Sequence, residues 1–176
     1  MAIVPDTKDW TWVLDKSCPE CGFDSAAVAY DDIPVLTRTH AALWPDVLAR
    51  KDVRVRPDES TWSALEYGAH VRDVFRIFTE RVELVRAQDN PTFANWDQDI
   101  AAIEGRYWEQ DPVRLRDDVL AAGESAAGAF AAVPVADRGR GSRRSNGSIF
   151  TIDSLARYFV HDIVHHSYDV GANTAR

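Results

Sequence analysis

The sequence predicts an all-α protein that folds as a four-helix bundle. Three observations support this class: several long segments carry helical signals, strand-like alternation is nearly absent, and the length of 176 residues suits a single core. Hydrophobic residues make up 45% of the chain, which is enough to bury such a core and excludes global disorder. Because the connections between the helical segments are uneven in length, a bundle is favoured over a repeat architecture.

The first helix is expected within residues 25–50, where apolar residues recur among polar neighbours. Pro34 follows Asp31 and Asp32, and proline is favoured in the first turn of a helix. The same proline leaves the first boundary of this helix open.

The second helix is expected over residues 61–88 and carries the strongest amphipathic signal in the chain. Apolar side chains recur at spacings of four, three and four residues: Tyr67, Val71, Val74 and Phe78. Ser60 and the two acidic residues before it offer N-caps, and Pro91 stops the helix.

Three more helical segments complete the bundle. A short one is expected over residues 96–108, and a longer one follows Asp111 and Pro112, because aspartate before proline is a good helix opening. It runs to about residue 132. The last helix is expected from about Thr151 to residue 170.

Two other regions have no helical pattern. Residues 1–24 are rich in tryptophan and irregular, and we interpret them as an N-terminal arm that packs on a bundle domain formed by residues 25–176. Residues 134–148 hold four arginines, with glycines and serines, which indicates a surface loop. The stretch 53–55 is the only hint of a strand.

Charge and composition exclude several classes of partner. A formal net charge of −8 disfavours nucleic acid and anionic membrane surfaces, because both are bound mainly through lysine and arginine. No apolar run approaches the roughly 18 residues of a membrane span, and the first residues do not resemble a signal peptide. We therefore expect a cytoplasmic protein with no membrane partner.

His161 and His165 form a candidate metal-binding pair on the last helix. Residues four apart lie on one helix face, so both imidazoles can reach the same ion. Such a pair is a weak signal alone, since histidines at this spacing also occur facing solvent or at helix ends, and the neighbouring His166 could share the role. Tyr158 falls on the same face and is a candidate for binding substrate.

His70 lies on the inward face of the most amphipathic helix. A buried imidazole must be hydrogen-bonded or ligate a metal. The simpler interpretation is a core histidine paired with a backbone carbonyl, Glu66 or Asp73. In a bundle, however, His70 could join the pair on the last helix, and three imidazoles suit Zn²⁺ or Ni²⁺ with a coordination position left open.

Carboxylates and arginines near these positions have candidate supporting roles. Asp73, Asp162 and Asp169 could orient imidazoles by hydrogen bonding, or could simply be solvated. The arginines of residues 138–144 could bind an anionic thiol or substrate, although a solvated loop is the favoured interpretation.

Cys18 and Cys21 are the only cysteines, in the turn Cys-Pro-Glu-Cys-Gly. Their spacing matches one half of a zinc ribbon, but no second cysteine pair exists, and adding His40 would leave only three ligands. A redox dithiol is a second interpretation, without the usual strand-then-helix setting. The third is a tight turn of packed thiols that orders the arm, which could also cover the metal site.

Trp62, His70 and Asp73 on one helix, followed about 90 residues later by His161-x-x-x-His165, resemble the DinB superfamily. This superfamily includes mycothiol-dependent maleylpyruvate isomerases and S-transferases that use bacillithiol or other low-molecular-weight thiols. The resemblance spans most of the chain and implies a bundle of up-down-down-up order with a divalent metal held by His70, His161 and His165. In the maleylpyruvate isomerase branch a carboxylate holds the first position of the last-helix pair; His161 stands there, so the chain resembles an all-histidine branch.

The resemblance implies an S-transferase that uses its metal to activate the thiolate of a small thiol toward an electrophilic substrate. Arginine greatly outnumbers lysine, which suggests a GC-rich source and hence mycothiol as the thiol. Metal-dependent hydrolysis and a non-catalytic, metal-binding stress-response bundle, as a homodimer, stay open as alternatives. The sequence assigns no catalytic residue beyond the three metal ligands.

Overall fold

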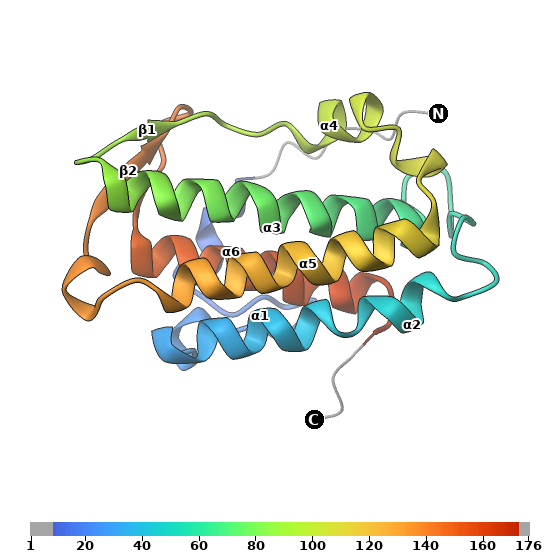
Figure 1. The fold of residues 1–176 in the computed structure, drawn as a ribbon, viewed down its shortest axis with the longest axis horizontal. Helices are drawn as coiled ribbons and strands as arrows, with labels where there is room; N and C mark the ends of the chain where they lie inside the picture. The colour runs from blue at the N-terminus through green and yellow to red at the C-terminus, as the bar shows by residue number, and fades with distance from the viewer. Residues whose placement is uncertain (1–8, 173–176) are drawn as a thin grey trace.

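Four helical rods packed along their lengths form the body of the protein in a computed structural model, which describes residues 9–172 (Figure 1). The first rod is two short helices in line, and the other three are single long helices. In chain order they are α1 (Ile33–Ala41) with α2 (Trp44–Leu48), α3 (Ala64–Ala87), α5 (Pro112–Ala131) and α6 (Ile152–Asp169). The predicted all-α four-helix bundle is confirmed.

The order of the rods is up-down-down-up. Figure 1 shows α1 and α6 running in one direction and α3 and α5 in the other. Because α3 and α5 are parallel neighbours in sequence, the chain must return along the length of α3 between them. This return segment holds the short elements β1 (Thr92–Phe93), α4 (Gln98–Glu104) and the 3₁₀ turn η4 (Tyr107–Glu109). It lies over one side of α3 and closes the bundle there.

Helix α3 begins at a capping box. The Ser63 hydroxyl accepts a hydrogen bond from the Glu66 backbone N–H, and the Glu66 carboxylate accepts one from the Ser63 N–H. The predicted start at residue 61 is therefore a few residues early. Ser60 instead donates to the Asp58 carboxylate in the preceding turn.

Helix α6 begins as predicted, with Thr151 as N-cap in a capping box with Ser154. Its apolar face fills the core, where the Phe159 ring lies 5.0 Å from Phe130 and 5.2 Å from Phe78 between centroids. Phe159 is fully buried. The polar face of α6 therefore points away from the core, toward the N-terminal segment and α3.

A small sheet that the sequence did not predict links two connections, the one between α3 and α5 and the one between α5 and α6. Its order is β1-β2-β3, with β1 parallel to β2 (Gly141–Arg144) and β2 antiparallel to β3 (Ile149–Thr151). The expected loop over 134–148 is thus partly a strand, and the hint of a strand at 53–55 is wrong because those residues form a turn.

An arginine in this region closes the end of α3. The Arg140 guanidinium donates hydrogen bonds to the backbone carbonyls of Val85 and Gln88, in the last turn of the helix. This arrangement satisfies carbonyls that have no partner within the helix. The basic run is therefore part of the packed structure rather than a solvated loop.

The N-terminal segment packs along α6. It consists of the 3₁₀ turns η1 (Trp10–Leu14), η2 (Ser25–Ala27) and η3 (Tyr30–Asp32), with the cysteine turn between the first two. The Arg157 guanidinium on α6 donates to the carbonyls of Ser25 and Val28. Residues 1–8 of the expected arm lie outside the described residues, and the boundary at residue 24 stays a prediction.

Within residues 9–172, no helix combines the length and the apolar character needed to cross a membrane.

Candidate metal centres

Side chains of the types that bind metals form two groups along α6. The first, called here the aspartate group, consists of His70, Asp162 and His166. The second, called the cysteine group, consists of Cys18, Cys21, His161 and His165. Within each group the donor atoms all lie within 4.8 Å of one another.

The structure distributes the three predicted ligands between these groups. His161 and His165 lie together in the cysteine group, whereas His70 lies in the aspartate group. The reason is the pitch of α6: successive residues are 100° apart, so two pairs of residues spaced by four share the helix and face different neighbours. One pair faces the N-terminal segment, and the other faces α3.

The aspartate group combines short distances with missing hydrogen bonds. Asp162 Oδ1 lies 3.5 Å from His70 Nε2 and 3.2 Å from His166 Nε2. These are ion-pair distances, yet neither Asp162 Oδ1 nor either His70 nitrogen has a partner with hydrogen-bond geometry among the described residues. Buried polar atoms rarely stay unpaired, and an ion at the point they share is one explanation.

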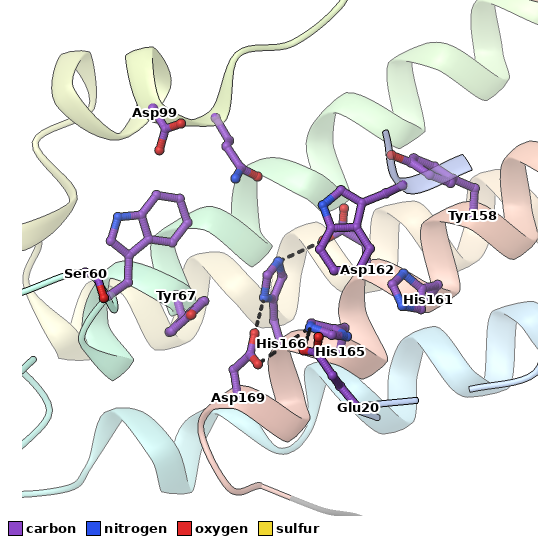
Figure 2. Close-up of a pocket in the computed structure, with 13 residues that line it drawn as sticks. Glu20, Ser60, Tyr67, Asp99, Tyr158, His161, Asp162, His165, His166 and Asp169 are labelled. Atoms are coloured by element: carbon purple, nitrogen blue, oxygen red, sulfur yellow. Dashed lines mark hydrogen bonds and ion pairs between the residues drawn. The ribbon is translucent and has the colours of Figure 1, made fainter. Parts of the chain in front are cut away.

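Asp169 fixes the orientation of His166. Its Oδ2 lies 2.9 Å from His166 Nδ1, so Nδ1 donates to this carboxylate and Nε2 is directed toward Asp162 and His70. Figure 2 shows the ring of His166 between the two carboxylates. A carboxylate on the far nitrogen of a ligating histidine sets its tautomer and raises its basicity.

Charges in the aspartate group are strongly coupled. Burial raises the pKa of Asp162, but the close imidazoles of His166 and His70 outweigh it and hold that pKa well below its usual range. Burial lowers the pKa of His166, and Asp162 and Asp169 reverse the effect and raise it to about 9. Burial also lowers the pKa of His70, which stays neutral with a lone pair available.

Aromatic rings hold His70 in place. Its ring stacks on Trp96 of the return segment, with centroids 5.2 Å apart, and Trp62 lies at the same distance. His166 meets it edge-on at 4.6 Å. Since His70 is only 1% exposed, these rings exclude water from its sides and leave its polar edge toward Asp162.

The cysteine group joins the N-terminal segment to α6. Cys18 Sγ lies 3.6 Å from His165 Nδ1, and His161 Nε2 is buried without a hydrogen-bond partner among the described residues. The Trp10 ring covers both histidines, at centroid distances of 5.7 Å and 5.3 Å. Burial raises the pKa of the Cys21 thiol to about 12, which disfavours a redox dithiol, because such chemistry needs a thiolate.

A cavity of about 320 Å³ opens beside both groups. Its walls include Asp162 and His166 from one group and His161 and His165 from the other, as Figure 2 shows. The remaining lining residues are aromatic, polar or acidic: Trp10, Glu20, Ser60, Trp62, Tyr67, Gln98, Asp99, Tyr158 and Asp169. The described lining contains four carboxylates and neither lysine nor arginine.

Tyr158, predicted to bind substrate, lines this cavity. The arginines of the basic run do not. Arg138 pairs with Asp31 at 2.5 Å, and Arg144 binds Asn146 and Ser148 and approaches the Tyr158 hydroxyl at 3.5 Å.

From the sequence, Asp162 was expected to have only a supporting role, and His166 was considered only as a neighbour that could share the role of His165. The signal that could have found them is Asp162-x-x-x-His166, which has the same spacing as His161-x-x-x-His165 and places a carboxylate first. Likewise, the cysteine turn lacked two further candidate ligands, and the pair on the last helix lies close enough to provide them.

Fold and donor groups together define a four-helix bundle of up-down-down-up order with two candidate metal centres. No family model matches this chain, and no curated protein matches it. Among solved structures it is similar to YfiT from Bacillus subtilis, described as a probable metal-dependent hydrolase with an unusual four-helix bundle topology. That similarity has a TM-score of 0.72 at 13% sequence identity and covers 83% of this chain and 88% of the other. At this identity the similarity establishes the fold alone.

Proposed function

We propose that the protein is a divalent-metal-dependent enzyme whose metal is held by His70, Asp162 and His166. The observation that carries the proposal is the convergence of these donors, with their unpaired polar atoms, beside an open cavity. This set revises the predicted trio of histidines, in which His161 and His165 took the places now given to Asp162 and His166.

The donor set fits such a metal. Two imidazoles and one carboxylate form the protein ligands of several catalytic zinc sites, and three protein ligands leave a position open. Donors around zinc lie about 3.4 Å apart by the same bond lengths, and the two distances to Asp162 Oδ1 are 3.2 Å and 3.5 Å. Zinc and nickel are the metals we propose. When bound, such a metal lowers the pKa of a coordinated thiol or water, so that the nucleophile forms at neutral pH.

The surrounding residues prepare the site. Asp169 holds His166 with Nε2 directed inward, and Trp62 and Trp96 fix the ring of His70. Asp162 contributes negative charge that offsets part of the charge of a divalent cation. These contacts restrict the donors to one arrangement, which a reactive site needs.

The cavity favours a thiol cosubstrate that carries no negative charge apart from its thiolate. Its described lining has four carboxylates without lysine or arginine, so a dianionic substrate such as maleylpyruvate would meet like charges. Tryptophan and tyrosine faces with neighbouring hydroxyls suit a sugar-containing thiol of the mycothiol type. We therefore propose S-transfer from such a thiol to an electrophile, with Tyr158 contacting the substrate.

Hydrolysis is the second candidate function. The description of YfiT as a probable metal-dependent hydrolase favours it, and a site that activates a thiol can also activate water. The open cavity argues against a purely non-catalytic metal-binding bundle, for which we would expect a closed site. Dependence of turnover on added thiol separates the two enzymatic candidates.

Metal analysis and turnover test the proposal together. Protein purified without a nickel column is loaded with zinc, and turnover of a chlorinated bimane is followed with mycothiol, bacillithiol or glutathione. His70→Gln and Asp162→Asn are expected to lose about one metal ion per chain and nearly all turnover. Asp117→Asn, an exposed carboxylate on α5, is the matched control and should change neither.

The outcomes separate the alternatives. Unchanged metal content in both variants would overturn the site, and turnover of ester or amide substrates without thiol would replace S-transfer by hydrolysis. If no substrate of either kind is turned over by the zinc-loaded protein, the proposed enzymatic function is wrong.

A further inference from the structure

The cysteine group raises the question of a second metal site, separate from the aspartate group. Its four donors come from two parts of the chain: Cys18 and Cys21 from the N-terminal turn, His161 and His165 from α6. All four are buried or partly buried. The first pair has two intervening residues and the second has three, which are spacings found in Cys₂His₂ zinc sites.

The turn that carries the cysteines is shaped to present both thiols to one side. The Gly22 N–H donates to the Cys18 carbonyl at 2.9 Å, and the Cys18 N–H donates to the Phe23 carbonyl at 2.8 Å. Gly22 has a φ of 73°, in the left-handed region where glycine is favoured. The chain therefore folds back tightly enough to bring the two sulfur atoms together against α6.

The distances already approach those around zinc. With Zn–S bonds of about 2.3 Å and Zn–N bonds of about 2.0–2.1 Å, tetrahedral sulfur and nitrogen donors lie about 3.6 Å apart. Cys18 Sγ and His165 Nδ1 are 3.6 Å apart, and every pair of donors lies within 4.8 Å. Movements of up to about an ångström would bring all four donors to the spacing that a tetrahedral zinc ion requires.

Two further observations point to a ligand. His161 Nε2 is buried and has no hydrogen-bond partner among the described residues. His165 turns its other nitrogen, Nε2, toward Glu20 Oε2 at 3.4 Å and Asp169 Oδ1 at 3.7 Å. Carboxylates in this position orient ligating histidines and leave the inward nitrogen free to bind.

We propose that Cys18, Cys21, His161 and His165 bind one zinc ion as a closed structural site that fastens the N-terminal segment to α6. Two thiolates balance the charge of the ion, so the site is neutral beside the charged aspartate group. Because all four ligands come from the protein, no position is open for a substrate. The site fixes the Trp10 wall of the cavity and the turn of α6 that also carries Asp162 and His166.

Cobalt substitution of the wild-type full-length protein tests this site without any variant. Co²⁺ bound by two thiolates and two imidazoles in a tetrahedron gives a thiolate-to-cobalt charge-transfer band in the near ultraviolet and intense d–d bands in the visible. We expect both features, and their loss when Zn²⁺ is added to displace the cobalt. Absence of the charge-transfer band from the cobalt-loaded protein overturns the proposal, as does a Cys18–Cys21 disulfide in protein purified under reducing conditions.

Variants then assign the ligands. Cys18→Ser with Cys21→Ser is expected to bind about one metal ion fewer per chain and to lose the charge-transfer band. Asp162→Asn should also lose about one ion but keep the band, because its ligands differ. His40→Gln, a buried histidine outside both groups, is the control and should keep both. A cysteine double variant that retains the full zinc content overturns the assignment.

A conservative variant separates the loss of metal binding from a failure to fold. Cys21→His keeps four ligands, so it should retain zinc even if the serine variants fail to fold. Its cobalt-substituted form should show a weaker charge-transfer band, because one thiolate is left. Loss of the bound zinc from correctly folded Cys21→His protein would contradict a tetrahedral site at this position. This result is independent of turnover and therefore of the proposed enzymatic function.

Discussion

His161 and Asp162 are consecutive residues on α6 whose side chains belong to different groups. His161 faces the two cysteines of the N-terminal turn, and Asp162 faces His70 on α3. A rotation of 100° around the helix separates the two directions. The same separation holds one turn later for His165 and His166, so a single helix contributes donors to both groups from adjacent faces.

This division predicts different consequences for two neighbouring substitutions. His161→Gln removes a ligand of the structural site, so it should lower the unfolding free energy of the zinc-loaded protein by about 3 kcal/mol at zinc concentrations about 100 times Kd. Asp162→Asn should also lose about one metal ion and the stability linked to it. It should in addition abolish turnover, because Asp162 belongs to the proposed reactive site, whereas His161→Gln should leave part of the turnover. Chemical denaturation and kinetic assays on both variants measure the difference. Indistinguishable effects on stability and turnover would contradict the separation into two sites.

The positions of the helices could be predicted because their signals are local. The capping box at Thr151 and the proline after Asp111 mark helix starts within a few residues of sequence. The three-stranded sheet could not, since its strands are two to four residues long and pair residues as distant as Thr92 and Arg143. Arginines in these strands also hide the alternation of polar and apolar residues that is typical of a strand.

The candidate sites were only partly predictable for a related reason. Spacing along α6 identifies two equivalent pairs, and nothing local determines which of them meets His70. The choice depends on the angle at which α3 packs on α6 and on the path of the N-terminal segment. For the same reason the sequence showed no partner for Cys18, because His165, which lies beside it in the structure, is 147 residues away along the chain.

Substitution of two glycines on α5 by alanine is expected to change the free energy of unfolding in opposite directions. A Cβ on Gly123 would lie 2.6 Å from the Ala41 Cβ on α1, and neither atom can move without its backbone. The overpacking, at about 1–3 kcal/mol, exceeds the gain in helix propensity of about 1 kcal/mol. Gly123→Ala should therefore destabilise the protein, by about 1 kcal/mol.

Gly128 is the matched control for this effect. It lies on the same helix, and a Cβ there meets nothing within 4 Å. Gly128→Ala should raise the unfolding free energy by about 0.5–1 kcal/mol, because alanine loses less backbone entropy on folding. Urea denaturation of the two variants checks both signs; stabilisation by both substitutions would show that α1 and α5 are less closely packed than described.

Arg157 is expected to be the anchor of the N-terminal segment. Its guanidinium donates to the Ser25 and Val28 carbonyls and pairs with Asp153 at 2.8 Å. Arg157→Lys keeps the charge but loses the fork of donors, so the segment should open more often and be cut faster by limited proteolysis. Arg116→Lys, in an exposed pair on α5, should leave the cleavage rate unchanged. Equal cleavage rates for wild type and Arg157→Lys would show that other contacts hold the N-terminal segment without Arg157.

His40 is predicted to make stability depend on pH. Its Nδ1 lies 2.9 Å from the Ser167 hydroxyl, which itself donates to the Ile163 carbonyl, so His40 carries its proton on Nδ1. Burial lowers the pKa of His40 to about 4. An unfolded histidine titrates near 6.5, so protons favour the unfolded chain: the contribution of His40 to stability is complete above pH 6.5 and is lost as the pH falls toward 4, by about 3 kcal/mol at most.

The variant His40→Gln isolates this effect, because its amide can donate to Ser167 and does not titrate in this range. Unfolding free energies of both proteins are compared from pH 7.5 to pH 4.5 at constant zinc concentration, so that contributions from the other histidines cancel. The wild type should be the more stable at pH 7.5, and its advantage should shrink as the pH falls. If the difference between the two proteins is the same at every pH, His40 does not titrate between its folded and unfolded pKa values, and the assigned cause of the pH dependence is wrong.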